Sequence, residues 1–352
     1  MAIKRGLVSR TLLVLVMALG AAAPATAAAS DPQAPLSMIL RSTGRTNMSA
    51  AAVGDKLQRS TARSRDVTGD GWPDVIARQP DLNNGTLWVY PHARTPQGAI
   101  FGARTMAGTN WNTMSWIGVA ELTGDTPEYE TSASAPADLL ARRTDGTLFI
   151  YPHSGALNGK STWLAPIVAG TNWNIYEFMI LGDINTDGFD DIFAIDNDEG
   201  KVYIYLHSGR LNGKSTFMPR QLWMEGSWLG TWMFLTEWSR EDPDLVGTIY
   251  DEDGAPSGNG EAARHTHKLN VGPGTWDTTD VWKWATAQEL APATTQRVFL
   301  MDVNGDGKDD VVKTTPAGAL VYYPFNGWKS NPALGTPRQI GNGGWQAFDL
   351  IT

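Results

Sequence analysis

The chain has 352 residues, a formal net charge of −9, 37 glycines, 15 tryptophans and no cysteine. The lack of cysteine excludes disulfides, zinc–thiolate sites and cysteine nucleophiles. An acidic chain without a basic face also argues against a nucleic-acid partner. Frequent glycine and tryptophan are typical of a turn-rich all-β fold.

The first 29 residues predict a secretory signal peptide. Lys4, Arg5 and Arg10 precede an apolar run at 11–20, and small residues at 25–29 offer a cleavage site. The apolar run is too short for a membrane span, which needs roughly 20 residues. We therefore expect a secreted protein without a membrane span, whose mature charge of −12 suits divalent cations.

Residues 30–60 stand outside the pattern of the rest of the chain. Their composition predicts a flexible N-terminal leader. Four basic residues in this segment also allow a contact with an anionic cell wall, namely Arg41, Arg45, Lys56 and Arg59.

Residues 61–352 contain an internal repeat, which is the organising signal of the sequence. Three nine-residue segments rich in aspartate match one another at 66–74, 183–191 and 302–310. Two eroded copies begin at Glu121 and Glu237. The five copies are about 60 residues apart, which favours radial repetition.

Each copy is followed by a short apolar strand, a tight turn, a second strand, a polar loop and a glycine-rich step to tryptophan. About four strands per repeat, without a helical period, predict an all-β fold, namely a β-propeller of about five blades. The segment 345–352 resembles the strand that precedes an aspartate loop, yet no loop follows it. We therefore expect the C-terminal strand to complete the first blade and close the ring.

The three intact loops predict calcium sites, because Ca²⁺ takes about six to eight oxygen ligands in flexible geometry. Glycine turns let alternate residues point inward together. An EF-hand is excluded, because its glutamate at position twelve is replaced by Ala194 and Lys313. The eroded loops are expected to hold no metal. The predicted ligands, with carbonyl donors at the fourth residue named, are Asp66, Thr68, Asp70, Trp72, Asp74; Asp183, Asn185, Asp187, Phe189, Asp191; and Asp302, Asn304, Asp306, Lys308, Asp310.

These repeats resemble FG-GAP/VCBS repeats, the calcium-loop propeller repeats of integrin α-chains and of many exported bacterial proteins, here of an actinobacterial type. The likeness covers residues 66–352 and is carried by the aspartate loops and the tryptophan step. It implies that the calcium, at about three sites, is structural. Such chains also look somewhat like five-bladed lectins.

Aromatic residues and histidines recur at the ends of the second strands and at the closing step. Aromatic packing between blades explains them, since both faces of a blade meet neighbours. The alternative is a ligand groove, because a few polar groups among aromatic side chains are typical of binding sites. The candidate ligand-binding residues are Tyr90, His92, Trp111, Tyr151, His153, Trp173, Asn174, Tyr205, His207 and Trp228.

We expect a non-catalytic binding module for carbohydrate or a cell-surface polymer such as a cell-wall polymer. Equivalent pockets on several blades would bind a repetitive polymer with avidity. A protein–protein interaction propeller, using loops at 125–137 and 251–265, is the first alternative. A polysaccharide lyase or hydrolase is the second, although no hydrolase elbow or zincin motif occurs. The one local cluster of histidine and carboxylate lies around His265 and His267.

Overall fold

The computed structural model describes residues 65–95, 99–124, 135–185, 187–223, 297–327 and 334–352. It also describes the backbone of Met224 and of the strands within 233–283. The predicted signal peptide, the leader, Trp228 and the fourth aspartate loop lie outside these residues.

The strands form five antiparallel sheets of four strands each. We number the sheets in chain order. The first sheet has the order β20 (Leu350–Ile351), β1 (Val75–Gln79), β2 (Thr86–Tyr90), β3 (Thr105–Gly108); the second β4 (Met114–Ala120), β5 (Asp138–Arg143), β6 (Leu148–Tyr151), β7 (Ile167–Gly170); the third β8 (Tyr176–Gly182), β9 (Asp191–Asp196), β10 (Val202–Tyr205), β11 (Gln221–Met224); the fourth β12 (Met233–Thr236), β13 (Asp244–Thr248), β14 (Glu261–His267), β15 (Trp276–Lys283); and the fifth β16 (Val298–Met301), β17 (Asp310–Thr314), β18 (Leu320–Tyr323), β19 (Arg338–Gly341).

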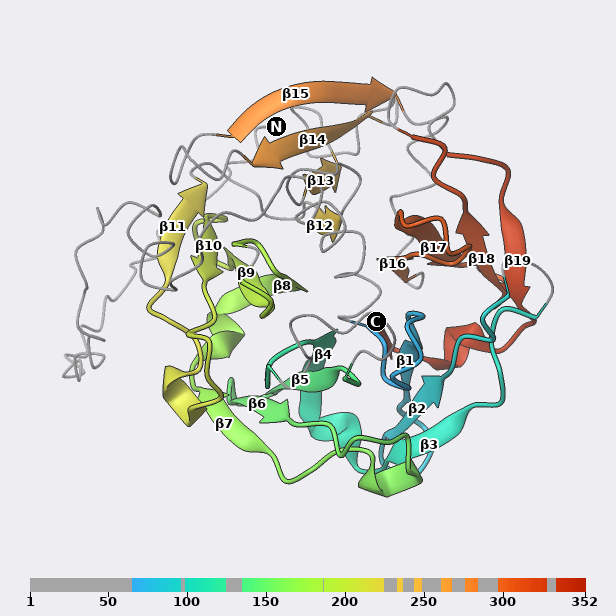
Figure 1. Ribbon diagram of the computed structural model, residues 1–352, viewed down its shortest axis with the longest axis horizontal. Helices are drawn as coiled ribbons and strands as arrows, with labels where there is room; N and C mark the ends of the chain where they lie inside the picture. The colour runs from blue at the N-terminus through green and yellow to red at the C-terminus, as the bar shows by residue number, and fades with distance from the viewer. Residues whose placement is uncertain are drawn as a thin grey trace, which may run out of the picture.

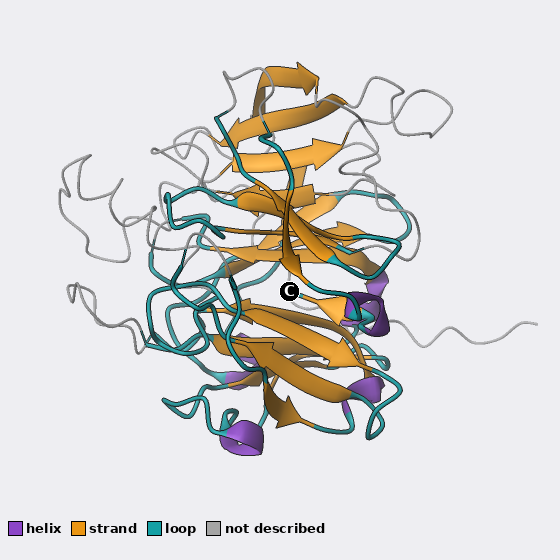
Figure 2. Ribbon diagram, turned by 90° about the vertical axis from the view of Figure 1, so that its right-hand side faces the viewer, coloured by secondary structure: helices purple, strands orange, loops and turns teal. Residues whose placement is uncertain are grey.

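The sheets stand around a central axis, with β4, β8, β12 and β16 nearest to it and β3, β7, β11, β15 and β19 outermost (Figure 1). The inner strands of neighbouring sheets contact one another from β20 through β4, β8 and β12 to β16. Seen from the side, the sheets stack as twisted layers (Figure 2). The prediction of an all-β propeller is therefore confirmed. No helix among the described residues has the length and apolar character to cross a membrane.

The C-terminal strand belongs to the first sheet. Leu350 pairs with Arg78 and Ile351 with Ala77, although these residues lie at opposite ends of the described chain. Thr352 and Ile76 also exchange backbone hydrogen bonds of 2.9 Å in both directions. The last residues of the chain thus supply the innermost strand of a sheet whose other strands come first.

The second and third strands of each sheet explain the core. β1, β5, β9 and β17 are runs of buried, largely apolar residues, as expected for strands covered on both faces. In β6, β10 and β18, buried residues alternate with partly exposed ones. This alternation places Leu148 and Ile150 in the core and sets Phe149 and Tyr151 toward the surface.

A tryptophan anchors the entry to three of the sheets. Trp111, Trp173 and Trp345 each begin a short 3-10 turn and lie buried. Each indole nitrogen lies against a glycine three or four residues earlier. A Cβ atom built on Gly108 or Gly170 would lie 2.1 Å from it. The glycine-rich step predicted from the sequence is therefore a steric requirement of the tryptophan that follows.

Two buried arginines, which the sequence analysis did not single out, tie neighbouring sheets together. Arg78 of the first sheet donates to the Trp111 carbonyl at 2.8 Å, at the entry to the second sheet. Arg142 of the second sheet donates to the Tyr176 carbonyl at 2.7 Å, at the entry to the third. Arg78 also forms an ion pair with Asp349 beside the C-terminal strand, with Nε 2.8 Å from Oδ1.

Candidate functional site

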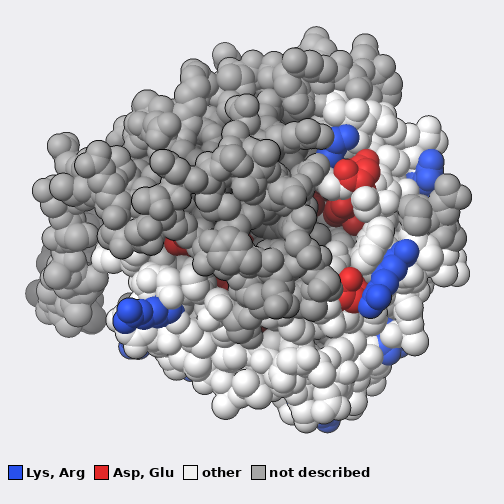
Figure 3. All heavy atoms as spheres, viewed as in Figure 1, with Lys and Arg blue, Asp and Glu red and all other residues white. Residues whose placement is uncertain are grey.

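The aspartate loops lie at the start of the second strands. The loop at 183–191 joins β8 to β9, the loop at 302–310 joins β16 to β17, and the loop at 66–74 leads into β1. On the face shown in Figure 3, acidic side chains lie toward the middle of the described surface, and basic side chains lie nearer its rim.

The last aspartate of each loop has the same partners in four sheets. Its Oδ2 accepts the N–H of the second loop residue, and its Oδ1 accepts an N–H at the end of the third strand. In the first sheet these donors are Val67 at 2.9 Å and His92 at 2.8 Å. The four residues are Asp74, Asp138, Asp191 and Asp310.

This arrangement persists in the eroded second loop. Asp138 accepts from Leu122 at 3.0 Å and from His153 at 2.7 Å, although the predicted metal ligands of that loop are missing. The last aspartate is therefore a structural residue that fastens the loop to the third strand. This role was not visible in the sequence, where the residue counted only as a calcium ligand.

The first aspartate organises the turn. Asp302 accepts the backbone N–H groups of Gly305 at 2.8 Å, Asp306 at 3.1 Å and Gly307 at 2.9 Å. Asp66 and Asp183 accept the corresponding groups of their own loops. In the second loop, Glu121 takes this place and accepts the N–H of Gly124 at 2.8 Å.

The third and fifth loop residues differ between copies. Asn185 donates its amide to Asp187 Oδ2 at 3.1 Å, and Asn304 does the same to Asp306 at 3.2 Å. In the first loop the third residue is Thr68, whose hydroxyl bonds to Asp66 instead. The equivalent oxygen, Oδ2 of Asp70, accepts from the Arg94 guanidinium.

The loop carboxylates are buried close to one another, and this shifts their proton affinity. Burial, reinforced by neighbouring carboxylates, raises the pKa of Asp74 to about 7 and that of Asp310 to about 8. Burial and the Asp187 charge also raise the pKa of Asp183 well above its ordinary value. A cation among these oxygens would relieve the repulsion.

The donor set of the third and fifth loops fits Ca²⁺, since it holds only carboxylate, amide and carbonyl oxygens. In the conformation described, the carboxylates turn toward backbone N–H groups. No three side chains of His, Cys, Asp or Glu gather as a metal cluster in the part of the chain that the structure describes. Calcium in these loops therefore stays a prediction.

The three histidines of the second-strand ends are buried. Nδ1 of His92, His153 and His207 accepts the N–H of the residue two positions later, at 2.9 to 3.0 Å. The remaining proton of these neutral rings therefore lies on Nε2, which in His92 donates to the Val303 carbonyl of the fifth sheet at 3.1 Å.

The aromatic residue in two aspartate loops stacks on these histidines. Trp72 lies on His92 and Phe189 on His207, each with ring centroids 4.6 Å apart. The same rings cover a glycine in the loop of the preceding sheet. A Cβ atom on Gly305 would lie 2.2 Å from Trp72, and one on Gly124 would lie 2.5 Å from Phe189. The aspartate loops of neighbouring sheets are thus interlocked.

The predicted ligand-binding residues divide by exposure. Trp111 and Trp173 are only 8% and 6% exposed and pack against Tyr151 and Tyr205, at 5.0 and 4.5 Å between centroids. Tyr90, which packs on Trp345, is half-buried like these two tyrosines, and Asn174 is exposed. The structure therefore brings the tyrosines and tryptophans together, with only the tyrosines and Asn174 reaching the surface.

A second set of aromatic residues, missed in the sequence, lies two positions before these tyrosines. Trp88, Phe149 and Tyr203 are partly exposed, and each is covered by an arginine. The guanidinium carbon lies 3.9 Å from the Trp88 centroid for Arg104, 5.1 Å from Phe149 for Arg143, and 4.3 Å from Tyr203 for Arg220. Arg104 and Arg220 both stand just before the fourth strand, a repeat signal that could have identified them.

These arginines also bond to tyrosine hydroxyls. Arg104 Nη1 donates to Tyr90 at 3.0 Å, and Arg220 Nη1 donates to Tyr176 at 3.1 Å. The Tyr176 hydroxyl is in turn hydrogen-bonded to that of Tyr205. Three successive sheets thus present an aromatic face with an arginine above it, and two of them add phenol hydroxyls beside it.

No family model matches this sequence, and no curated protein matches it. Among solved structures, the fold is similar to that of an Agrocybe aegerita lectin, described as recognising non-reducing terminal N-acetylglucosamine. The two chains are 17% identical, the alignment covers 82% of this chain and 68% of the lectin chain, and the TM-score is 0.41.

Proposed function

We propose that this chain is a secreted, non-catalytic binding module for carbohydrate or a cell-surface polymer. In this proposal the five sheets are the blades of a complete ring that the C-terminal strand closes, and the repeats are of the FG-GAP/VCBS kind. Structural calcium in the aspartate loops holds the inner part of the blades, most fully in the loops at 183–191 and 302–310.

The observation that carries the binding role is the recurrence of partly exposed aromatic residues under an arginine in three successive sheets. The three pairs are Trp88 with Arg104, Phe149 with Arg143, and Tyr203 with Arg220. An amphipathic aromatic ring offers an apolar face to one side of a sugar, and adjacent hydroxyl and guanidinium groups hydrogen-bond its substituents. Because the pairs repeat from sheet to sheet, a repetitive polymer would engage several at once and gain avidity.

The test is binding of purified residues 30–352 to a panel of glycans and cell-wall polymers, with Ca²⁺ and with EDTA. Saturable binding that weakens in both Trp88→Ala and Tyr203→Ala is the expected result. Leu164→Ala is the matched control, because Leu164 is an exposed apolar residue, 52% accessible, outside the aromatic pairs. A folded protein that binds no glycan under either condition would overturn the carbohydrate proposal and direct the search to protein partners.

A further inference from the structure

Arg94 occupies a position that belongs to glycine in the other described repeats. It lies two residues after His92, as Gly155 lies after His153 and Gly209 after His207. The backbone is also the same, because the N–H of each of the three bonds to the histidine Nδ1. In the fifth sheet, Gly327 follows Phe325 at the same spacing.

This position requires a left-handed backbone. The φ angle is +56° at Arg94, +91° at Gly155, +74° at Gly209 and +107° at Gly327. Glycine adopts such angles without steric cost, whereas a residue with a Cβ is strained there. The arginine therefore costs backbone energy in the first sheet that the other sheets avoid, and its side chain must supply the compensation.

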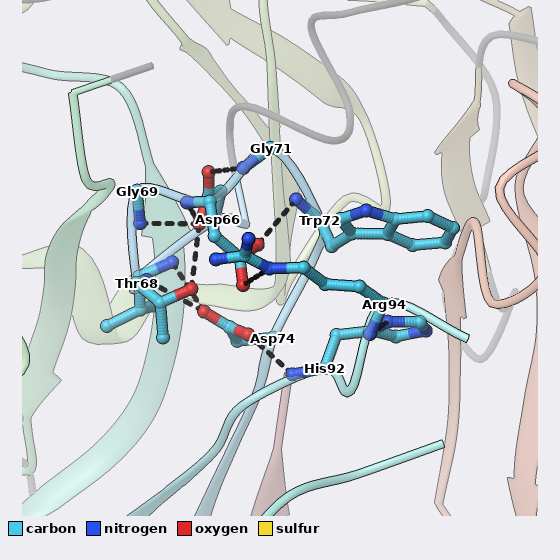
Figure 4. Close-up of polar contacts among 10 residues, drawn as sticks. Asp66, Thr68, Gly69, Gly71, Trp72, Asp74, His92 and Arg94 are labelled. Atoms are coloured by element: carbon cyan, nitrogen blue, oxygen red, sulfur yellow. Dashed lines mark hydrogen bonds and ion pairs between the residues drawn. The ribbon is translucent and has the colours of Figure 1, made fainter. Parts of the chain in front are cut away.

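The side chain reaches back to the first aspartate loop (Figure 4). Arg94 Nε donates to Asp70 Oδ2 at 2.7 Å, and the Asp70 side chain is only 9% exposed. The Asp66 and Asp74 carboxylates lie close enough to act on the same guanidinium, whose pKa is raised chiefly by the hydrogen bond to Asp70. The loop thus holds a positive charge of its own.

The third and fifth loops lack such a charge at this place. There the matching oxygens of Asp187 and Asp306 accept from a neutral asparagine amide. An amide can turn its oxygen toward a cation, whereas a guanidinium has only donors and repels one. The first loop also has Thr68 in place of that asparagine, so it lacks an amide oxygen at the third position.

We infer that Arg94 is the built-in cation of the first aspartate loop and closes it without a metal. The first loop was expected to bind calcium most weakly, and this inference removes it from the calcium sites. Only the ion count rests on the calcium proposed above for the loops at 183 and 302. The pairing of Arg94 with Asp70 is independent of it.

The first experiment counts bound Ca²⁺ per chain by native mass spectrometry and isothermal titration calorimetry on residues 30–352. We expect two ions in the natural chain and three in Arg94→Gly, which restores the glycine of the other repeats. Arg94→Asn is the second variant, because asparagine also tolerates the left-handed backbone but carries no charge. Three ions in the natural chain, or the same number in all variants, would overturn the inference.

The reciprocal variant places the arginine in a loop that lacks it. A Cβ atom on Gly209 would meet nothing closer than Phe189 at 4.0 Å, so Gly209→Arg has room for its side chain. We expect this variant to lose one ion relative to the natural chain. Retention of every ion by a folded Gly209→Arg would count against the idea that an arginine here displaces a metal.

A third measurement separates this inference from the calcium proposal. In EDTA, the free energy of unfolding is measured for Arg94→Gly and Asp70→Asn, alone and combined. We expect the arginine change to be less damaging in the Asp70→Asn background, because the charge that it balances is then gone. If no chain binds calcium, the calcium proposal fails while this coupling still supports the role of Arg94. Additive effects in EDTA would refute that role.

Discussion

The imidazole of His207 lies stacked on the ring of Phe189, with centroids 4.6 Å apart and planes inclined by 5°. Burial lowers the pKa of His207 to about 4, and its Nδ1 is already an acceptor for Gly209. Protonation would therefore break that hydrogen bond and place a charge in the core. The contact joins a histidine of the third strand to an aspartate loop, and it makes the fold sensitive to acid.

The first prediction concerns His207→Phe, which copies the natural Phe325 of the fifth sheet. Because the folded pKa lies below the unfolded value, the stability that the neutral ring contributes is complete above about pH 6.5 and is lost as the pH falls toward 4. We expect the variant to gain roughly 2 to 3 kcal/mol relative to the natural chain between pH 7 and pH 4.5. Urea unfolding at the two pH values measures it. An unchanged difference between the two chains would contradict the buried neutral histidine.

The second prediction concerns Asp138, the last aspartate of the eroded loop. Asp138→Ala leaves the buried N–H groups of Leu122 and His153 without their acceptor. We expect a loss of roughly 2 to 4 kcal/mol in the free energy of unfolding. The loss should be equal in Ca²⁺ and in EDTA, since this loop is expected to hold no metal. A loss that appears only in Ca²⁺ would mean that the loop binds an ion after all.

The third prediction is that removing calcium lowers the melting temperature. An ion that binds only the folded chain stabilises it by about 2.7 kcal/mol per site at a hundred times its dissociation constant. Asp187→Ala and Asp306→Ala should each remove part of the difference between melting in Ca²⁺ and in EDTA. Asp145→Ala, in an exposed turn where Asp145 pairs with Arg143, is the control. Identical melting of the natural chain in both solutions would exclude structural calcium.

The fourth prediction tests the tryptophan step. Gly170→Ala would place its Cβ atom 2.1 Å from the Trp173 indole nitrogen, so the ring must move away from Tyr205. We expect a loss of roughly 1 to 3 kcal/mol, as for other overpacked cores, with a change in tryptophan fluorescence. Gly102→Ala, whose nearest neighbour would be 3.7 Å away, should change stability little. Equal effects of the two substitutions would argue against the steric explanation.

The fifth prediction tests the attachment of the C-terminal strand. Arg78→Met removes the partner of Asp349 and the donor to the Trp111 carbonyl. Breaking such a largely buried pair typically costs about 3 to 5 kcal/mol. Arg142→Met is the comparison, because Arg142 makes the same kind of carbonyl contacts. If both variants lost the same stability, the ion pair to Asp349 would contribute nothing measurable.

The sequence allowed the fold to be predicted because each repeat carries its own turn signals and apolar runs. The glycines before Trp111 and Trp173 and the alternation in β6 and β10 are local features, and local features survive in a sequence without an alignment. The propeller arrangement follows from their repetition.

The candidate site was less accessible to sequence reasoning, because its contacts join distant segments. Asp74 looked like one more calcium ligand, although its partners Val67 and His92 give it a structural role. Arg94 lies 24 residues from Asp70 and breaks a glycine pattern that only the superposed repeats reveal. The histidines, predicted as possible ligand contacts, are held by backbone groups that no side-chain pattern encodes.

The aspartate loop is in effect two devices in one segment. Its last residue is a fastening that the second sheet keeps in Asp138, and its first five residues form a socket for positive charge. Because the fastening works when the socket is absent, a blade of this kind can gain, lose or exchange its cation without being rebuilt. One segment of sequence can therefore serve as a metal-dependent joint, a charge-locked joint or a plain one, side by side in the same ring.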